Sequence, residues 1–588
     1  GGGEYHSEAM NEKSSDECVR VEAHGLTWRV VRDFADALPE VQVLRLREPD
    51  RLESEGAADS WRVVKDNMHR TVVRAPDPGN PERAGLFLKR FKLRGFTRRL
   101  KHLVRPTQAA KEWEVSRALR KRGIPTCRVL AVAERRPGIL FREAFLVSRE
   151  LAGTIPLRDF LEAREWGEMD LARRRGLIDE LAELTAGMIA ADVGHDDLHL
   201  GNIMFDPRGV PGERLHVLDL HRVHVGRLSR RRITRMLVYL ADSTAKRGVG
   251  AAGRVRFLRR VLERWKDLES VTDGLVREWA SRVQKAWEKH YRRRMRSRTK
   301  RCVKESSEFT RDRDGGFRIW HRRELSVETA LKLIDWHRLA MEGGASRCEV
   351  RKDGSRTEIT FCPDTGAGPM FVKAFLRDGF FERLKDVLRP RGRTRGTWIA
   401  HRACRVRGVP AVPGLALMEA TGKLSGRPDY LLTRAVGAES DLQVLARAQS
   451  PDHPRHAELV LCRKERRRLS RTVANLYRLL AESGVRHRDL KPSNILVGRS
   501  GEGFRLWLVD LDRTRFEVDW TRRLWIYHLA QCNAGLADGI TLLDRMRCLR
   551  RVGKGRWSAR ERLAIAREVL ELSLQRDPEW LRDAAREC

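Results

Sequence analysis

The chain has 588 residues, of which 118 are lysine or arginine and 81 are aspartate or glutamate, so its formal net charge is +37 at pH 7. Hydrophobic residues make up 41% of it and charged residues 34%, a balance that excludes a disordered acidic chain and suits two to four folded domains. The positive charge favours polyanionic surroundings, such as nucleic acid, an anionic membrane face or a phosphorylated substrate.

The N-terminus and the cysteines indicate a cytoplasmic protein. The chain begins without the basic and then apolar segment that is typical of a signal peptide. The sequence contains no run of about 18 apolar residues, so no membrane span is predicted. The ten cysteines are scattered and form no Cys-x-x-Cys pair, so we expect reduced thiols and no structural zinc site. Residues 1–24 are predicted to be an N-terminal extension outside the folded domains.

In chain order, the first half predicts strands before helices. A strand at Leu86–Phe91 precedes a helix over Gln108–Arg122 and a strand at Phe145–Leu151. Next comes a helix whose apolar residues recur at steps of four, three and four, which places them on one face; they are Leu177, Leu181, Leu184 and Met188. A polar loop, a strand pair ending at Asp219 and mainly helical sequence follow.

The second half repeats this order. Residues 379–390 resemble residues 95–106, and the striped helix recurs about 290 residues later with Leu469, Val473, Leu476 and Leu480. The matching elements are expected at Met370–Phe375, Arg395–Arg407 and Tyr430–Val436, with a strand pair that ends at Asp510. A period of this length indicates a duplicated domain rather than a solenoid. We therefore predict two α+β domains, 25–295 and 296–588, with the boundary near Tyr291–Lys304, where basic residues crowd together.

The polar loops share the motif His-x-Asp-Leu-x-x-x-Asn, over residues 195–202 and 487–494, with the aspartate and the asparagine five positions apart. Transfer of the γ-phosphoryl group of a nucleotide needs hard oxygen ligands for Mg²⁺ and a further carboxylate that takes the proton of the acceptor hydroxyl. The loop aspartates fit the role of catalytic base, and the loop asparagines with the strand-end aspartates fit the metal. The predicted bases are Asp197 and Asp489, and the predicted metal ligands are Asn202, Asp219, Asn494 and Asp510.

These motifs resemble the protein-kinase-like superfamily. The resemblance extends upstream, because Leu86–Lys89 and Met370–Lys373 look like the strand whose lysine holds the α- and β-phosphates. It implies that Lys89 and Lys373 bind nucleotide and that Glu112, on the following helix, pairs with Lys89. The Asp-Leu-His-Arg and Asp-Leu-Asp-Arg sequences after the loops, the Gly-Ile-Pro and Gly-Val-Pro turns and the abundant arginine resemble one branch, the lipopolysaccharide-core (Kdo and heptose) kinase family.

The resemblance implies two tandem bilobal protein-kinase-like domains, each with a small β-rich lobe and a larger helical lobe. It implies ATP and Mg²⁺ as cofactors and a saccharide or lipid-linked saccharide as acceptor. The basic surface would then face an anionic membrane, peripherally on the inner side of the cytoplasmic membrane, rather than nucleic acid. For the basic segment at Arg292–Arg301, a solvated interdomain face is the first interpretation and attraction to a membrane surface is the second.

Some features depart from this family and leave alternatives open. The position that matches Glu112 is Thr397 in the second half, and neither half has a glycine-rich phosphate loop. No Ala-Pro-Glu sequence follows the metal aspartates, which disfavours a serine/threonine protein kinase, although Lys491 resembles the loop lysine of such enzymes. The alternatives are therefore a pseudokinase-like nucleotide-binding scaffold and a serine/threonine protein kinase.

Overall fold

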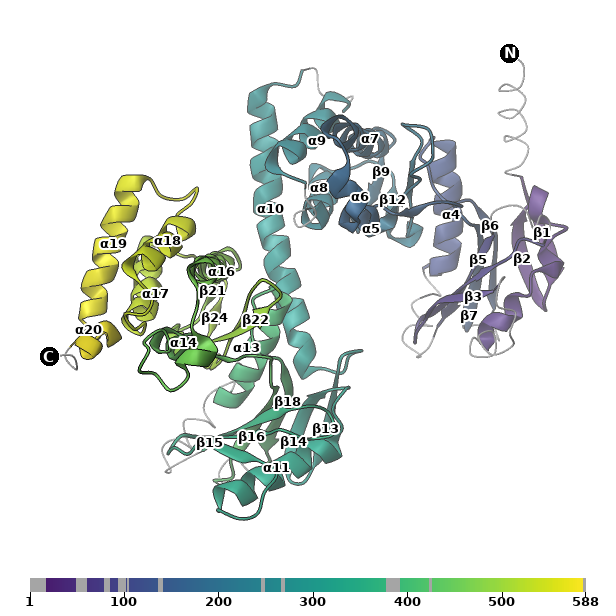
Figure 1. The fold of residues 1–588 in the computed structure, drawn as a ribbon. Coiled ribbons are helices and arrows are strands. Elements are labelled where there is room, and N and C mark those ends of the chain that lie inside the picture. Colours follow the sequence, from purple (N-terminus) through teal and green to yellow (C-terminus); the bar gives the residue numbers. More distant parts are fainter. Residues whose placement is uncertain are drawn as a thin grey trace. The chain divides into compact units, whose positions relative to one another are not determined.

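The computed structural model describes residues 17–48, 61–78, 85–93, 102, 105–135, 141–244, 249–265, 270–376, 392–421 and 426–584. Contacts divide the chain into two compact units, Gly1–Tyr291 and Arg292–Cys588, each of mixed helix and sheet (Figure 1). The repeated segments 95–106 and 379–390 lie outside the described residues, apart from His102, Arg105 and Pro106.

Each unit contains a seven-stranded antiparallel sheet, and the two sheets have the same strand order. In the first unit the order is β1-β2-β6-β7-β5-β4-β3, with bounds Cys18–Ala23, Leu26–Val31, Val129–Arg135, Glu143–Arg149, Leu86–Lys92, Arg70–Ala75 and Arg62–Asp66. In the second it is β13-β14-β18-β19-β17-β16-β15, with bounds Phe309–Asp314, Phe317–Arg322, Gly414–Ala420, Asp429–Arg434, Met370–Phe375, Thr357–Cys362 and Glu349–Lys352. The duplication inferred from the sequence therefore holds strand for strand.

One helix after the fifth strand of each unit packs on its sheet: α4 (Gln108–Lys121) and α13 (Arg393–Val406). Their tryptophans, Trp113 and Trp398, are fully buried. In the second unit, Leu417 and Leu431 pack with Trp398 on one face of the sheet, and the other face packs on α11 (Val327–Met341). The first unit has three short 3-10 helices in place of α11, at Arg32–Phe34, Leu38–Glu40 and Val43–Arg47. Burial of large aromatic side chains thus fixes each helix against its sheet.

The two polar loops lie among short strands. Residues 195–202 are flanked by β9 (Val193–His195) and β10 (Ile203–Phe205), which pair with β12 (Val223–Val225) and β11 (Leu215–Val217). Residues 487–494 are flanked by β21 (Val485–Arg486) and β22 (Ile495–Ser500), which pair with β24 (Arg515–Phe516) and β23 (Gly503–Leu508). The edge strands β8 (Ile155–Pro156) and β20 (Ser440–Asp441) complete the small sheets.

Helices form the remainder of each unit. In the first they are α5 (Leu157–Glu162), α6 (Arg164–Glu168), α7 (Leu171–Ala190), α8 (Arg230–Thr244), α9 (Ala251–Glu263) and α10 (Asp273–Thr299). In the second they are α14 (Leu442–Arg447), α15 (His456–Leu459), α16 (Arg463–Glu482), α17 (Arg522–Ala534), α18 (Leu542–Val552), α19 (Ala559–Leu574) and α20 (Glu579–Ala584). The predicted stripes lie on α7 and α16 and face the core, because their residues are buried except for the partly buried Leu184. Over the described part of the chain, no helix is both long and apolar enough to cross a bilayer.

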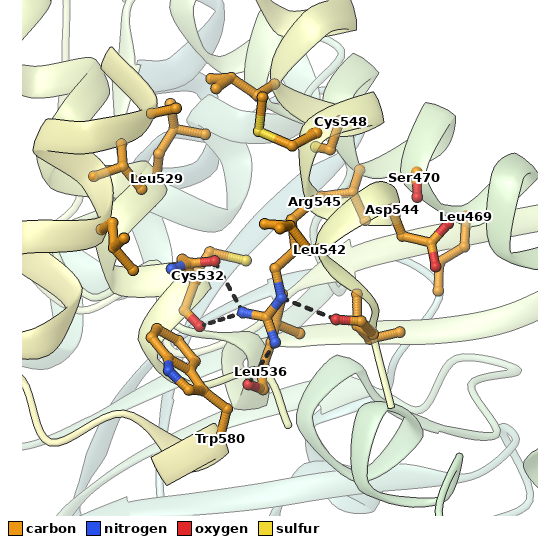
Figure 2. A pocket seen from close by; sticks show the side chains of 18 of the residues that line it. Leu469, Ser470, Leu529, Cys532, Leu536, Leu542, Asp544, Arg545, Cys548 and Trp580 are labelled. Atoms are coloured by element: carbon orange, nitrogen blue, oxygen red, sulfur yellow. Dashed lines mark hydrogen bonds between the residues drawn. The ribbon is translucent and has the colours of Figure 1, made fainter. Parts of the chain in front are cut away.

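The helices of each unit enclose an apolar cavity. In the second unit it measures about 410 Å³ and lies among α16, α17, α18 and α19 (Figure 2). Arg545 reaches the wall of this cavity from α18 and donates hydrogen bonds to the backbone carbonyls of Asn533, Leu536, Ala537 and Ile540. A smaller cavity of about 280 Å³ occupies the matching place in the first unit, against the stripe residues Leu177 and Leu181. Neither is lined by a predicted site residue.

The structure differs from the sequence-based expectation at the N-terminus, and its two units divide at the start of the predicted boundary region Tyr291–Lys304. Residues 18–23, assigned to the extension 1–24, form β1 and pair with β2 from Cys18↔Val31 to Ala23↔Leu26, because Val19, Val21 and Ala23 alternate onto the core. The units divide after Tyr291, four residues before the end predicted for the first domain, and helix α10 continues to Thr299. Met295 and Thr299 lie one helical turn apart and are both buried, which supports helix through the basic segment.

The expectation of reduced thiols is wrong for one pair. Cys348 and Cys362 form a disulfide at the hairpin of β15 and β16, with their Cα atoms 4.2 Å apart. The two residues are fourteen positions apart in sequence, and only the antiparallel pairing of the two strands brings them together. Seven other cysteines of the described chain are free.

Candidate active site

The polar loop of the first unit is held by its buried histidine. The ring Nε2 of His195 lies 2.9 Å from the carbonyl oxygen of Leu218, and the backbone N–H of Asp197 donates to its Nδ1 at 3.1 Å. Since Nδ1 accepts, Nε2 must carry the proton, so the neutral ring bridges the loop and β11. Burial lowers the pKa of His195, which keeps the ring neutral.

The loop asparagine connects the loop aspartate to the strand end. The side-chain N–H of Asn202 donates to the carbonyl oxygen of Asp197 at 3.0 Å, and its own backbone carbonyl accepts from Leu218 at 2.8 Å. Leu218 directly precedes Asp219. Asp197, Asn202 and Asp219 are therefore brought to one place, as the motif predicted.

The second unit repeats these contacts. His487 Nε2 lies 2.9 Å from the carbonyl oxygen of Val509. Asn494 donates to the carbonyl oxygen of Asp489 at 2.8 Å and accepts from Val509 at 3.1 Å. Burial lowers the pKa of His487 as it does that of His195. The second loop differs in two contacts: the Nδ1 of His487 is buried without a hydrogen-bond partner among the described residues, and Asn494 also donates to the Asp489 carboxylate at 3.3 Å. The bonds of the histidine and the asparagine to the strand end are nevertheless common to both loops.

The strand-end aspartates share a rare backbone conformation. Asp219 has φ of +61° and Asp510 has φ of +52°, both in the left-handed region. Such angles are uncommon outside glycine, and aspartate adopts them more readily than most residues. The turn at the strand end therefore has the same backbone conformation in both units.

In the first unit, Lys89 of β5 pairs with Glu112 of α4. Lys89 Nζ lies 2.8 Å from Glu112 Oε2, and Glu112 is 1% exposed. Burial lowers the pKa of Lys89, but the charge of Glu112, the nearby Cys127 and the hydrogen bond to Glu112 together outweigh it and leave the pKa raised. Burial likewise raises the pKa of Glu112, and Lys89 and His221 reverse this and lower it. Both groups are therefore charged at neutral pH.

His221 connects this ion pair to Asp219. Its Nδ1 lies 3.0 Å from Asp219 Oδ1 and 3.4 Å from Glu112 Oε1. Burial lowers the pKa of His221, but hydrogen bonding to Asp219 and Glu112 raises it above its ordinary value. For Asp219, burial raises the pKa, and His221, Arg70 and Lys89 together lower it to about 2. An unbroken series of contacts therefore links all five predicted residues of the first unit.

The second unit balances its lysine differently. Lys373 of β17 lies 2.8 Å from Asp510 Oδ1, and no contact joins it to a carboxylate of α13 within the described residues. Thr397 occupies the position of Glu112 and donates its hydroxyl to the carbonyl of Arg393. Arg393 in turn pairs with Asp512 at 2.6 Å, where the first unit has His221. Burial raises the pKa of Asp510 and the charge of Lys373 lowers it, with a net lowering.

The hairpins in the place of a phosphate loop are built without a glycine-rich sequence. In the first unit, the side chain of Asn67 accepts from the backbone N–H groups of His69 and Arg70, both at 2.9 Å. Arg70 Nη1 lies 3.9 Å from Asp219 Oδ1. An asparagine turn thus replaces glycine and brings an arginine to the site.

The sequence-based prediction missed four contributors: His221, Arg70, Arg393 and Asp512. His221 and Asp512 lie two residues after a predicted metal ligand, and that spacing is a signal that could have identified them. Arg70 and Arg393 have no such signal, because their elements meet the site only through the fold. Glu112, Asp219 and His221 also form a group whose ligand atoms lie within 4.8 Å of one another, but the ion pairs above already account for their closeness.

Comparison with known proteins gives a consistent result. The sequence model of the lipopolysaccharide kinase (Kdo/WaaP) family matches residues 86–260 and 374–531, more than half of the chain. The lipopolysaccharide core heptose(I) kinase WaaP of Pseudomonas aeruginosa is 27% identical over 191 residues, which are 31% of this chain and 70% of that protein. The WaaP kinase of Escherichia coli is 27% identical over 190 residues, 32% of this chain and 72% of that protein. A solved structure titled "WaaP in complex with acyl carrier protein" has a TM-score of 0.30 and 24% identity, and covers 42% of this chain and 96% of that one.

Removal of Glu112 is predicted to destabilise the first unit. Glu112→Ala leaves the ammonium group of Lys89 without its partner in a desolvated place, and we expect a loss of about 3 kcal/mol in the free energy of unfolding. Urea unfolding of the full chain measures this loss. The control is Glu114→Ala on the same helix, whose exposed pair with Arg29 should contribute less than about 1 kcal/mol. Equal losses from both variants would contradict the proposed importance of the buried pair.

The contribution of Asp219 to stability should depend on pH. Its pKa is lowered on folding to about 2, so its contribution is fully present above about pH 4, the unfolded value, and is lost as the pH falls towards 2. Urea unfolding should therefore show that Asp219→Asn destabilises the protein by about 2 kcal/mol at pH 7 and by clearly less at pH 3. Asp206→Asn, in the loop after β10, is the control and should show no such change. A loss from Asp219→Asn that is the same at both pH values would refute this prediction.

Proposed function

The chain belongs to the lipopolysaccharide kinase (Kdo/WaaP) family and is a kinase, and from this premise we propose that it phosphorylates a sugar hydroxyl of the lipopolysaccharide core or of a related lipid-linked saccharide, using ATP. The observation that supports this most directly is the connected cluster of Lys89, Glu112, Asp219, Asn202 and Asp197. It brings the groups that phosphoryl transfer needs into one place.

In this proposal Asp197 is the base. The acceptor hydroxyl gives its proton to the Asp197 carboxylate as its oxygen attacks the γ-phosphorus, and ADP leaves with the electrons of the broken P–O bond. The Asp197 carboxylate makes no hydrogen bond or ion pair with any other described residue, which leaves it available to an acceptor. Lys89, held by Glu112, would hold the α- and β-phosphates.

The residues at the strand end suit Mg²⁺. Asp219 has a carboxylate that stays ionised, since its pKa is about 2, and Asn202 uses its amide N–H in the loop and keeps its amide oxygen for another partner. Hard oxygen ligands of this kind are those that Mg²⁺ prefers. When bound, the metal would neutralise charge on the phosphate oxygens. In the second unit, Asn494 and Asp510 would hold it.

The tandem bilobal arrangement is also part of this proposal. Each unit has a seven-stranded sheet and a group of helices with separate hydrophobic clusters, which supports a small lobe and a larger helical lobe in each. We retain two kinase-like domains, 25–295 and 296–588, with the correction that residues 18–23 belong to the first sheet.

The two domains are proposed to differ in competence. Lys373 pairs with Asp510, the proposed metal ligand, so nucleotide and metal must displace that pair before they can bind. Lys491 Nζ also lies 3.2 Å from the Asp489 carboxylate. These contacts favour a second domain that binds nucleotide and turns over slowly, in the manner of the pseudokinase-like alternative. Within the described residues, Lys491 is the one feature that resembles the protein-kinase alternative.

The net charge of +37 supports work at an anionic surface. We propose that the protein acts in the cytoplasm, peripherally on the inner face of the cytoplasmic membrane, where a lipid-linked and already phosphorylated saccharide would present negative charge. Binding of nucleic acid is not part of this proposal.

The base assignment is tested by phosphate transfer. With labelled ATP, Mg²⁺ and deacylated lipopolysaccharide core as acceptor, Asp197→Ala should lower the rate by about 10²- to 10⁴-fold, because proton transfer from the hydroxyl loses its acceptor. Asp196→Ala is the control, since this neighbouring carboxylate pairs with Arg235 instead. A rate that survives Asp197→Ala would end this assignment.

The division of work between the domains is tested by the matching substitution in the second. Asp489→Ala should reduce the rate by less than about tenfold, a small part of the effect that loss of a catalytic base produces. Asp197→Ala combined with Asp489→Ala should be no slower than Asp197→Ala alone within error. A loss from Asp489→Ala equal to that from Asp197→Ala would show that both domains turn over.

A further inference from the structure

The second unit contains a basic hollow that is separate from its active-site cleft. It has a volume of about 800 Å³ and is lined by residues 296–304, by the strands β13 and β14, by α13 and by residues 516–517. None of the predicted site residues lines it. Its aromatic wall is Trp320, a side chain only 5% exposed.

Positive charge dominates this hollow. Arg296 and Arg407 share Glu517, the one carboxylate among the lining residues, and Arg395 pairs with Glu419. Four further lining cations make no ion pair with any described residue; they are Lys300, Lys304, Arg311 and Arg318. Four like charges around one hollow repel one another, and a bound anion would relieve that repulsion.

Two guanidinium groups stack on Trp320. That of Arg395 lies 4.7 Å from the ring centroid and that of Arg311 lies 5.6 Å from it. Stacking fixes the planes of these groups. Arg395 already donates to Glu419 through Nε and Nη2, whereas the guanidinium of Arg311 makes no ion pair with a described residue and presents its N–H edge to an oxygen acceptor. The Nε of Arg318 is buried and has no hydrogen-bond partner. The hollow therefore offers oriented donors as well as charge, which is the combination that phosphate groups bind best.

The first unit lacks these features on the matching face. Trp320 pairs with Leu417 and Arg29 with Val132, at equivalent positions of the two sheets. Arg29 therefore replaces Trp320, and it pairs with Glu114 at 2.9 Å. By the same register Thr27 replaces Arg318, and Ala110 replaces Arg395 as the third residue of its helix. Arg20 keeps the charge of Arg311 in the first unit, since it pairs with Arg29 as Arg311 pairs with Trp320. The combination of Trp320 with Arg318 and Arg395 is therefore the part of the hollow that is particular to the second unit.

We propose that this hollow binds a ligand that carries two or more phosphate groups. Its volume suits a small molecule or a lipid headgroup rather than a nucleic-acid duplex. The proposal goes beyond the proposed function, because no predicted site residue lines the hollow and because binding there needs no phosphoryl transfer.

The test is calorimetric titration of inorganic tripolyphosphate into the full chain. Substitution of glutamine for Lys300, Lys304 and Arg311, all exposed side chains, should weaken binding by about tenfold or more, since charge-assisted hydrogen bonds are lost. The control replaces Arg550, Lys554 and Arg560 by glutamine, which removes the same charge from another exposed cluster of the second unit and should change binding less than about twofold. Equal weakening in both variants would overturn the proposal.

Two further arms locate the site and identify the phosphate source. The double variant Lys89→Ala with Lys373→Ala should still bind tripolyphosphate tightly. If it does not, the binding belongs to the candidate active sites and the proposal is overturned. Co-sedimentation with vesicles of phosphatidylcholine and doubly charged phosphatidylinositol phosphate, compared with phosphatidylcholine alone, tests a headgroup. Vesicle binding lost only in the hollow variant identifies a lipid source; tripolyphosphate binding without vesicle binding identifies a soluble one. The single variant Lys304→Gln covers the case in which the triple variant does not fold. If it weakens neither tripolyphosphate binding nor vesicle binding, the proposal fails.

Discussion

Each seven-stranded sheet carries a lysine on an inner strand that must stay beside a carboxylate. The side chains of Lys89 and Lys373 are each only 18% exposed, and a charge so far removed from water costs several kcal/mol unless it is paired. In the first unit the partner, Glu112, comes from a helix. In the second it is Asp510, from the turn after a strand. The choice of partner determines how the rest of each site is arranged.

A helix carboxylate leaves the strand-end carboxylate available. Because Glu112 neutralises Lys89, the ion pairs that Asp219 makes with described residues are those with His221 and Arg70. Burial raises the pKa of Asp219, and His221, Arg70 and Lys89 together lower it to about 2. In the second unit, Lys373 forms an ion pair directly with Asp510. In both loops the histidine and the asparagine make the same hydrogen bonds to the strand end and to the loop aspartate, so the ion pair of the lysine is the main difference between the sites.

Much of the fold could be predicted from the sequence, because the duplication provided two independent views of each element. The strand Met370–Phe375 is predicted with its observed bounds. The striped helices are predicted by their apolar positions but not by their ends, and the grouping of Asp197, Asn202 and Asp219 follows from their motif. The partner of Lys373 could not be predicted in the same way. The sequence shows Thr397 in place of a helix carboxylate, but that Asp510 becomes the partner depends on where the strand end lies in the fold. The Cys348–Cys362 disulfide was missed for the same reason, since strand pairing and not spacing brings the two together.

Changes along one helix connect the two special features of the second unit. Four positions on alternate residues of α4 read Gln108, Ala110, Glu112 and Glu114, and the matching positions of α13 read Arg393, Arg395, Thr397 and Ile399. Two acidic side chains are lost and two basic ones gained. Because Thr397 stands where the first unit has Glu112, Lys373 pairs with Asp510 instead of with a helix carboxylate. Arg393 pairs with Asp512. Ile399 stands where the first unit has Glu114, and Arg395 where it has Ala110. The hollow around Trp320 therefore has no carboxylate from this helix to balance its positive charge. Neighbouring substitutions on one helix therefore change the partner of Lys373 and place Arg395 in the basic hollow.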